Sequence, residues 1–324
     1  MRERVPQRET NPFPYSDSNK RYHTFDYYLR KKYGEKCAVV ALDAGFTCPN
    51  IDGTRGVGGC IFCSGRGSGD FAGDARLPLS LQYARQREAI AAKWDCRRFL
   101  PYLQAHTNTH APIERLKEVY AELKALPDAA ALHIATRADA IDPERAALLA
   151  ELAQEHDLTV ELGLQSICDE TARRINRCHT YAEFLRGYGL LRDASDRIRI
   201  AVHLINGLPG EGSDGMLASA EAVGALGVDE IKIHLLYVLA RTPLAKLYLE
   251  GGYTPMTEEA YVETVVRQLE LLPPETVVGR LTGDAPRREL LAPTWSLAKM
   301  RILNAIDRRL FETDTFQGAK YKSK

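Results

Sequence analysis

The 324-residue sequence lacks the features that mark several specialised classes of protein. Charge of neither sign is in excess, since 43 lysines and arginines balance 43 aspartates and glutamates. No global field therefore attracts nucleic acid or a membrane surface, and such a partner would have to use a local patch. No apolar run reaches the roughly 18 residues of a membrane-spanning helix. The opening stretch, MRERVPQRETNPFPYSDSNKRYHTF, has no apolar core of the kind that a secretory signal needs.

The composition that is present is that of an ordinary globular protein, with 45% hydrophobic residues. The length suffices for one large domain or two modest ones. Seven cysteines, in a sequence without an export signal, predict a reducing cytoplasm. In that compartment, clustered cysteines bind metal or carry out redox chemistry more often than they form disulfides.

Short apolar runs alternate with helical stretches along most of the chain. Six of these runs are typical of strands, at residues 37–44, 98–107, 131–136, 158–166, 197–210 and 229–238. Such alternation predicts an α/β fold with a parallel sheet and right-handed crossovers. The strand number fits an open or partial (β/α) barrel better than eight full units. In such folds the chemistry gathers at the carboxyl ends of the strands.

The alternation stops near residue 240. Beyond it we expect a helix around 257–272, a short strand at 277–282 and a helix near 295–311, which together form a small α+β appendage. The sequence thus predicts an N-terminal basic and aromatic extension over 1–36, a partial barrel over 37–238 and a C-terminal region over 239–324.

A glycine-rich stretch with three cysteines, CPNIDGTRGVGGCIFC, follows the first predicted strand directly. A thioredoxin-like redox pair needs only Cys60 and Cys63 and gives no role to Cys48. Zinc bound by three cysteines and one histidine is possible, with His106 or His110 of HTNTH as the fourth ligand. An iron–sulfur cluster uses all three cysteines and leaves one iron open to another ligand. The spacing favours the cluster over zinc.

The residues around these cysteines strengthen that interpretation. Four glycines, at positions 53, 56, 58 and 59, allow the backbone to approach a bulky cluster closely. Phe62 places an aromatic side chain between two of the cysteines. The other four cysteines are isolated in the sequence and are expected to be structural thiols, with a second cluster as the alternative: Cys37, Cys96, Cys168 and Cys178.

The spacing Cys48-x11-Cys60-x2-Cys63, with an aromatic residue before the last cysteine, resembles the signature of the radical S-adenosylmethionine superfamily. The widened spacing is similar to its YhcC/YtqA-type branch, which is related to the radical domain of the Elongator catalytic subunit. Further stretches resemble that branch in order from about residue 20 to 311: LDAGFTCPNIDGTRGVGGCIFC, QAHTNTHAPIERLKEVY, ATRAD, VELGLQS, RINRCHTYAEF, HLINGLPGE, IKIHLLYVLARTPLA and RLTGDAPRRELLAPTWS.

The resemblance implies a partial (β/α)6 TIM-like barrel, a [4Fe–4S] cluster and S-adenosylmethionine. Its methionine amine and carboxylate would chelate the open iron. One electron from the cluster would then cleave the sulfonium to methionine and a 5′-deoxyadenosyl radical, which abstracts hydrogen from a substrate. An electron donor such as flavodoxin or ferredoxin is implied as a partner.

The resemblance also implies which residues bind S-adenosylmethionine. Gln165 would contact its ribose or methionyl part, and Arg177 its carboxylate, although a solvated surface arginine is the alternative. His203 would meet the ribose, or else is a satisfied core histidine. Gln104 and Thr107 close the second strand, where many relatives carry Gly-Gly-Glu for the amine; this chain has no such glutamate.

ATRAD resembles a Thr-Arg-Pro-Asp element of that branch, with Ala138 in place of the proline. A simple ion pair between Arg137 and Asp139 is the alternative to a role in the site.

The relation to Elongator indicates tRNA as the substrate, at the side chain of the wobble uridine. Local support comes from a basic patch with interleaved tyrosines: Arg21, Arg30, Lys31 and Lys32 with Tyr22, Tyr27, Tyr28 and Tyr33. The C-terminal GAKYKSK adds positive charge. Two alternatives stay open: the same radical chemistry on a protein or small metabolite, and a non-enzymatic, zinc-bearing RNA-binding protein.

Overall fold

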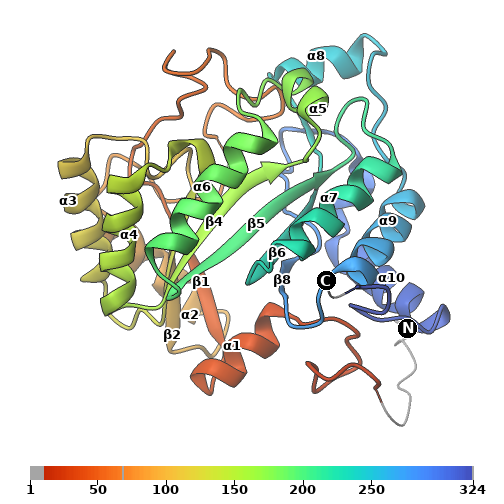
Figure 1. The fold of residues 1–324 in the computed structure, drawn as a ribbon, viewed down its shortest axis with the longest axis horizontal. Helices are drawn as coiled ribbons and strands as arrows, with labels where there is room; N and C mark the ends of the chain where they lie inside the picture. The colour runs from red at the N-terminus through yellow and green to blue at the C-terminus, as the bar shows by residue number, and fades with distance from the viewer. Residues whose placement is uncertain (1–10, 68, 323–324) are drawn as a thin grey trace. The chain divides into compact units, whose positions relative to one another are not determined.

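A computed structural model describes residues 11–67 and 69–322. The first ten residues of the predicted N-terminal extension and the last two of GAKYKSK lie outside this range. Seven strands form one sheet in the order β1-β2-β3-β4-β5-β6-β8 (Figure 1). The pairs β1–β2, β2–β3, β3–β4 and β6–β8 are all parallel. The predicted α/β fold of the partial TIM-like barrel type is confirmed.

All six predicted strands are present, at β1 Cys37–Leu42, β2 Arg98–Leu103, β3 Leu132–Thr136, β4 Leu158–Gln165, β5 Ile198–Asn206 and β6 Glu230–Leu235. The count of six is nevertheless wrong, because β8, Val277–Arg280, joins the sheet as a seventh strand. Its Val277 and Val278 lie beside Glu230 and Ile231 of β6. The sequence pattern predicts this short strand as part of the C-terminal appendage instead.

Ten α-helices lie within the described residues, at α1 Phe25–Tyr33, α2 Leu79–Ala91, α3 Ile113–Lys124, α4 Pro143–Glu155, α5 Asp169–Arg174, α6 Tyr181–Ala194, α7 Ser213–Ala225, α8 Pro243–Leu249, α9 Glu258–Leu271 and α10 Lys299–Glu312. The 3-10 helices are η1 Ala138–Ala140 and η2 Thr294–Leu297. β7 Val238–Leu239 and β9 Leu290–Ala292 form a separate antiparallel pair. None of the described helices combines the length and the apolar character needed to cross a bilayer.

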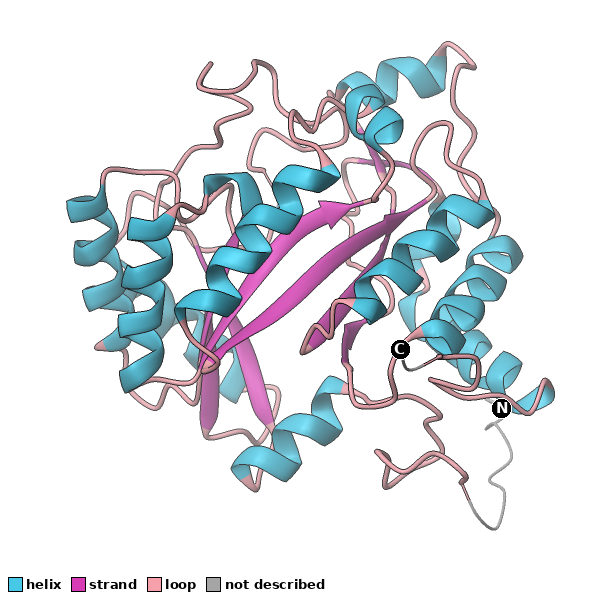
Figure 2. Cartoon of the chain, in the orientation of Figure 1, coloured by secondary structure: helices cyan, strands magenta, loops and turns pink. Residues whose placement is uncertain are grey.

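The chain divides into two compact units, which we describe separately. The first comprises residues up to 28, 165–175 and 202 onward; the second comprises 29–164 and 176–201. In the second unit, β1 is followed by a stretch, 43–78, in which the described residues form no helix or strand and are drawn as loop (Figure 2). The three clustered cysteines lie in this stretch.

Helices of the second unit bury one face of its strands. Val40, Leu103, Ile134 and Val160, from four successive strands, have no exposed surface. α3 packs beside α4, and α4 beside α6 (Figure 1). α6 also packs closely on η1, because a Cβ atom at Gly187 would lie 2.0 Å from the carbonyl oxygen of Ala138. A glycine at this position therefore brings the middle of α6 close to η1, just after β3.

In the first unit, α9 packs against both α7 and α10 (Figure 1). Arg21 also belongs to this unit, and its side chain is 4% exposed. Its guanidinium donates to Leu310 O, Asp314 Oδ1 and Thr315 O at 3.1–3.2 Å. The prediction that Arg21 contributes to an accessible basic patch is therefore wrong, since the charge holds the segment after α10.

Candidate functional site

The loop from Cys48 to Cys63, which we call the cysteine loop, folds back on itself through main-chain hydrogen bonds. Arg55 N and Gly56 N donate to Pro49 O at 2.7 and 3.1 Å. Gly59 N donates to Asn50 O at 2.8 Å, and Cys63 N to Cys60 O at 3.0 Å. These bonds return the chain to its starting point, so the cysteines at the two ends of the loop come together.

The thiols of the loop influence one another's ionisation. Interaction with the Cys63 thiol lowers the pKa of Cys60, and the same interaction raises the pKa of Cys63, with Cys48 adding to the rise. All three are free and half-buried. Three thiols in one loop suit an iron–sulfur cluster that leaves one iron open to another ligand.

The two histidines considered for a zinc site have other surroundings. His110 Nε2 lies 2.8 Å from Asp52 Oδ2, and His106 Nδ1 would lie 2.8 Å from a Cβ atom at Gly67. Among the residues that the structure describes, no three His, Cys, Asp or Glu side chains are arranged to hold a single metal ion.

The segment between α5 and α6 lies against the cysteine loop. The amide nitrogen of Asn176 donates to Val57 O at 3.1 Å and to Gly59 O at 2.7 Å. In return, Asn50 Nδ2 donates to Asn176 O. Asn176 and Cys178 both have positive φ angles, 55° and 61°. Such angles are unusual for residues other than glycine. The contacts with the loop stabilise this backbone.

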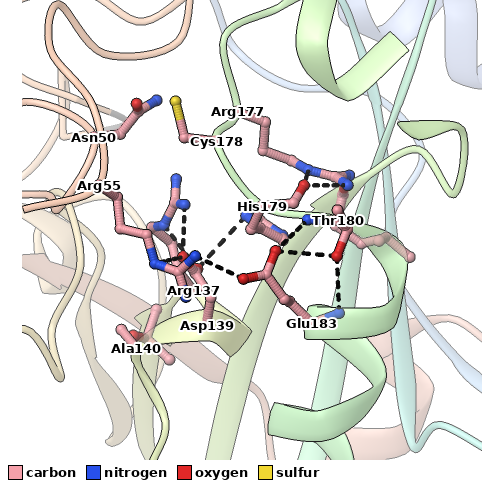
Figure 3. A network of polar contacts seen from close by, with 12 residues as sticks. Asn50, Arg55, Arg137, Asp139, Ala140, Arg177, Cys178, His179, Thr180 and Glu183 are labelled. Atoms are coloured by element: carbon pink, nitrogen blue, oxygen red, sulfur yellow. Dashed lines mark hydrogen bonds and ion pairs between the residues drawn. The ribbon is translucent and has the colours of Figure 1, made fainter. Parts of the chain in front are cut away.

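Asp139 of η1 is the centre of a network of charges beside the loop (Figure 3). Its carboxylate, with no exposed surface, accepts two hydrogen bonds from Arg137 at 2.9 and 3.0 Å. Arg55 of the cysteine loop lies 3.4 Å from the same carboxylate. The ion pair between Arg137 and Asp139, which is one interpretation of ATRAD, is thus present, and Arg55 of the cysteine loop joins it.

Arg55 also connects the cysteine loop to the start of α6. Its Nη1 donates to Glu183 Oε1 at 2.6 Å. Glu183 forms a capping box with Thr180, which gives hydrogen-bond partners to backbone N–H groups at the start of α6. Burial opposes ionisation of Glu183, but hydrogen bonds from Thr180 and Arg55 outweigh it and lower its pKa to about 2. Arg55 therefore connects the cysteine loop to both η1 and α6.

His179 lies between these charges as a neutral side chain. It is 5% exposed, and neither ring nitrogen makes a hydrogen bond to a described residue. Its Nδ1 is 3.5 Å from Asp139 Oδ1 (Figure 3). Burial, followed by the charges of Arg177 and Arg137, lowers its pKa to about 2.

His179→Phe is expected to make the free energy of unfolding depend less on pH below pH 7. A histidine in the unfolded chain has a pKa of about 6.5. Below that pH the unfolded chain therefore binds a proton at position 179, while His179 of the folded protein stays neutral. Stability is therefore lost as the pH falls, by about 2 kcal/mol between pH 7 and 5 from this group. Urea unfolding of metal-free protein at both pH values should show that the variant lacks this loss. Parallel curves for the two proteins would contradict the assignment.

The other predicted residues of the second unit lie around the loop or at the ends of strands. Phe62 is half-buried in the loop. Gln104 N donates to Leu42 O at 3.3 Å at the end of β2, and Thr107 N donates to Thr47 O at 3.2 Å, next to Cys48. Thr107 is 1% exposed, and its hydroxyl has no hydrogen-bond partner among the described residues.

Arg177 is not a surface residue, since 1% of it is exposed. Its Nε and Nη2 donate to His179 O at 3.1 and 2.9 Å, and Nη1 donates to Leu164 O. These bonds fix the turn before α6 to the end of β4. Contact with a cofactor carboxylate stays a prediction.

Gln165 and His203 belong to the first unit. Gln165 ends β4 with a φ of 62°, an angle that costs energy in a residue other than glycine. The ring of His203 stacks on His234 of β6 at 5.1 Å between centroids. Their contacts with a cofactor also stay predictions.

Sequence reasoning missed Asn50, Arg55, His179 and Glu183. The signal available for Asn50 and Arg55 was their position between Cys48 and Cys60. A polar side chain within a loop that carries cluster ligands has a reason to be held there. Asn50 has no exposed surface. His179 directly follows RINRC, and Glu183 takes part in the cap of α6, which gives no indication of a tertiary partner.

Comparison with known proteins gives a consistent result. The model of the Radical SAM superfamily matches residues 51–223, and that of the Radical_SAM C-terminal domain matches residues 228–312. YtqA of Bacillus subtilis is 44% identical over 310 residues, which are 96% of each chain. YhcC of Escherichia coli K12 is 35% identical, over 88% of this chain and 90% of the relative.

Similarity to Elongator is partial. Elongator complex protein 3 of Dictyostelium discoideum is 29% identical over 131 residues, or 39% of this chain and 23% of that protein. Among solved structures, Elp3 of the archaeon Methanocaldococcus infernus superimposes with a TM-score of 0.64 at 19% identity, over 87% of this chain and 64% of that one. At this identity the likeness shows the fold.

Proposed function

This chain belongs to the radical S-adenosylmethionine superfamily, and from that premise we propose that it is a radical enzyme that modifies tRNA at the side chain of the wobble uridine. Cys48, Cys60 and Cys63 would hold a [4Fe–4S] cluster. When bound, the cluster and S-adenosylmethionine supply a 5′-deoxyadenosyl radical that abstracts hydrogen. The convergence of three free thiols in one loop at the end of β1 carries this proposal.

The protein's own residues would bind and orient the cofactor. Phe62, Gln104 and Thr107 lie in or beside the cysteine loop. The buried Thr107 hydroxyl, which makes no hydrogen bond to a described residue, supports a ligand at this point, because such a group is costly to leave unpaired. Gln165, Arg177 and His203 complete the proposed set.

For tRNA, the support is local. α1 carries Arg30, Lys31 and Lys32 in its last turn. Lys31 and Lys32 are exposed, and Lys32 shares Asp157 with Tyr33. Cations and aromatic rings are the groups that bind RNA phosphates and bases. A cytoplasmic location, and reduction by a donor such as flavodoxin or ferredoxin, complete the proposal.

Two assays test it. Protein reconstituted anaerobically with iron and sulfide, then reduced with dithionite, should convert S-adenosylmethionine to 5′-deoxyadenosine. Mass spectrometry of tRNA nucleosides should show a wobble-uridine modification that disappears in cells without the protein. Cleavage with an unchanged tRNA profile would favour a protein or small metabolite as substrate. Colourless protein with stoichiometric zinc would favour the non-enzymatic alternative.

A further inference from the structure

We propose that Asn50 and Arg137 set the reduction potential of the cluster through its cysteine ligands, with Asp139 holding Arg137 in place. The inference rests on the proposed function, because it needs the cluster at Cys48, Cys60 and Cys63. It concerns residues that touch the ligands or lie beside them, and that therefore act as positioning residues. Neither Asn50 nor Arg137 is needed to supply a ligand.

Asn50 supplies a hydrogen bond to a ligand sulfur. Its Nδ2 lies 3.5 Å from Cys60 Sγ, within the range for a bond to sulfur. The same nitrogen donates to Asn176 O. This carbonyl fixes the orientation of the amide, since the flipped side chain would bring two oxygens together. Asn50 has no exposed surface, so the contact with Cys60 is shielded from water.

Arg137 supplies a fixed positive charge. Its side chain is 9% exposed and shares the carboxylate of Asp139 with Arg55 of the cysteine loop. Its charge therefore lies beside the loop, where it acts on Cys48 and Cys60. Two of its N–H groups are held by Asp139, which itself is fixed by Arg55. The guanidinium therefore has little freedom to turn away. Arg55 and Arg137 both pair with Asp139, and Arg55 also pairs with Glu183.

Both features favour the reduced cluster. Reduction adds one negative charge, which is shared with the ligand sulfurs. An N–H donor at a sulfur and a nearby cation stabilise the more negative state, and these are known determinants of cluster potentials. The low dielectric of a buried site increases the effect of each. A less negative potential would make the cluster easier for the electron donor to reduce.

The test is a redox titration of reconstituted protein, followed by electron paramagnetic resonance. Asn50→Leu removes the donor at similar volume, and Arg137→Gln removes the charge. Each is expected to lower the ratio of reduced to oxidised cluster about tenfold at a fixed potential, which corresponds to 59 mV for one electron. Arg137→Lys should restore part of the loss. Arg76→Gln, at a side chain 88% exposed, controls for a change of net charge.

The outcomes separate the two proposals. If wild-type protein holds no iron–sulfur cluster, the proposed function fails. If wild-type and variant proteins hold equal iron and titrate at the same potential, the inference alone is overturned. Asn50 also bonds to Asn176, so Asn50→Leu could unfold the loop; circular dichroism and iron content check this. In that event the comparison of Arg137→Gln with Arg137→Lys decides. A residue with a purely structural role would change the stability of the protein and leave the reduction potential of the cluster unchanged.

Discussion

Cys60→Ala is expected to abolish retention of iron, from about four atoms per reconstituted chain to almost none. Cys60 is central to the three thiols, since it interacts directly with Cys63, and its charge is influenced by Arg137, Asn50 and Arg177. The two remaining cysteines would be too few to hold a cubane. Formation of 5′-deoxyadenosine should fall to background, while the half-buried loop position limits the effect on folding to about 1 kcal/mol.

Iron and sulfide assays, the visible spectrum and thermal unfolding of metal-free protein measure these effects together. Cys168→Ala is a matched control, because Cys168 is an exposed cysteine of the same chain outside the cysteine loop. It should keep full iron content and cleavage. Cofactor cleavage that survives in Cys60→Ala would contradict the assignment of ligands, as would equal loss of iron in the control.

The sheet could be predicted because each strand is an apolar run followed by a helix, a pattern that local sequence carries. β8 was misplaced for a physical reason. It is only four residues long, Val277–Arg280, and pairs with β6 across two intervening helices, α8 and α9. Its role depends on pairing between distant segments, which the composition of the strand does not reveal.

The candidate site likewise has a part that the sequence predicts and a part that it does not. Cys48, Cys60 and Cys63 could be found from spacing, since a metal cluster needs several thiols near one another. The network around Asp139 could not, because Arg55, His179 and Glu183 come from separate elements and have no periodic signal. Arg21 shows the opposite error. A cation among tyrosines is expected to be accessible, yet it is buried against main-chain carbonyls in the last turn of α10 and just after it.

Asp139→Ala is expected to have the largest effect on stability, a loss of about 3–5 kcal/mol in the free energy of unfolding. The carboxylate has no exposed surface and compensates Arg137, whose side chain is 9% exposed. Without it, the buried guanidinium loses two hydrogen bonds and its counter-charge. Arg55 loses one of its two acidic partners, which loosens the cysteine loop, so iron retention should also fall.

Urea unfolding of metal-free protein measures the loss, and Asp142→Ala is the matched control. Asp142 caps α4 three residues further along, pairs with Arg145 and is 48% exposed, so its removal should cost about 1 kcal/mol. Asp139→Ala combined with Arg137→Met should recover part of the stability, because the unpaired buried charge is removed as well. Equal losses in the two single aspartate variants would mean that the buried network adds nothing beyond a helix cap. The cysteine loop would then be held by its own hydrogen bonds.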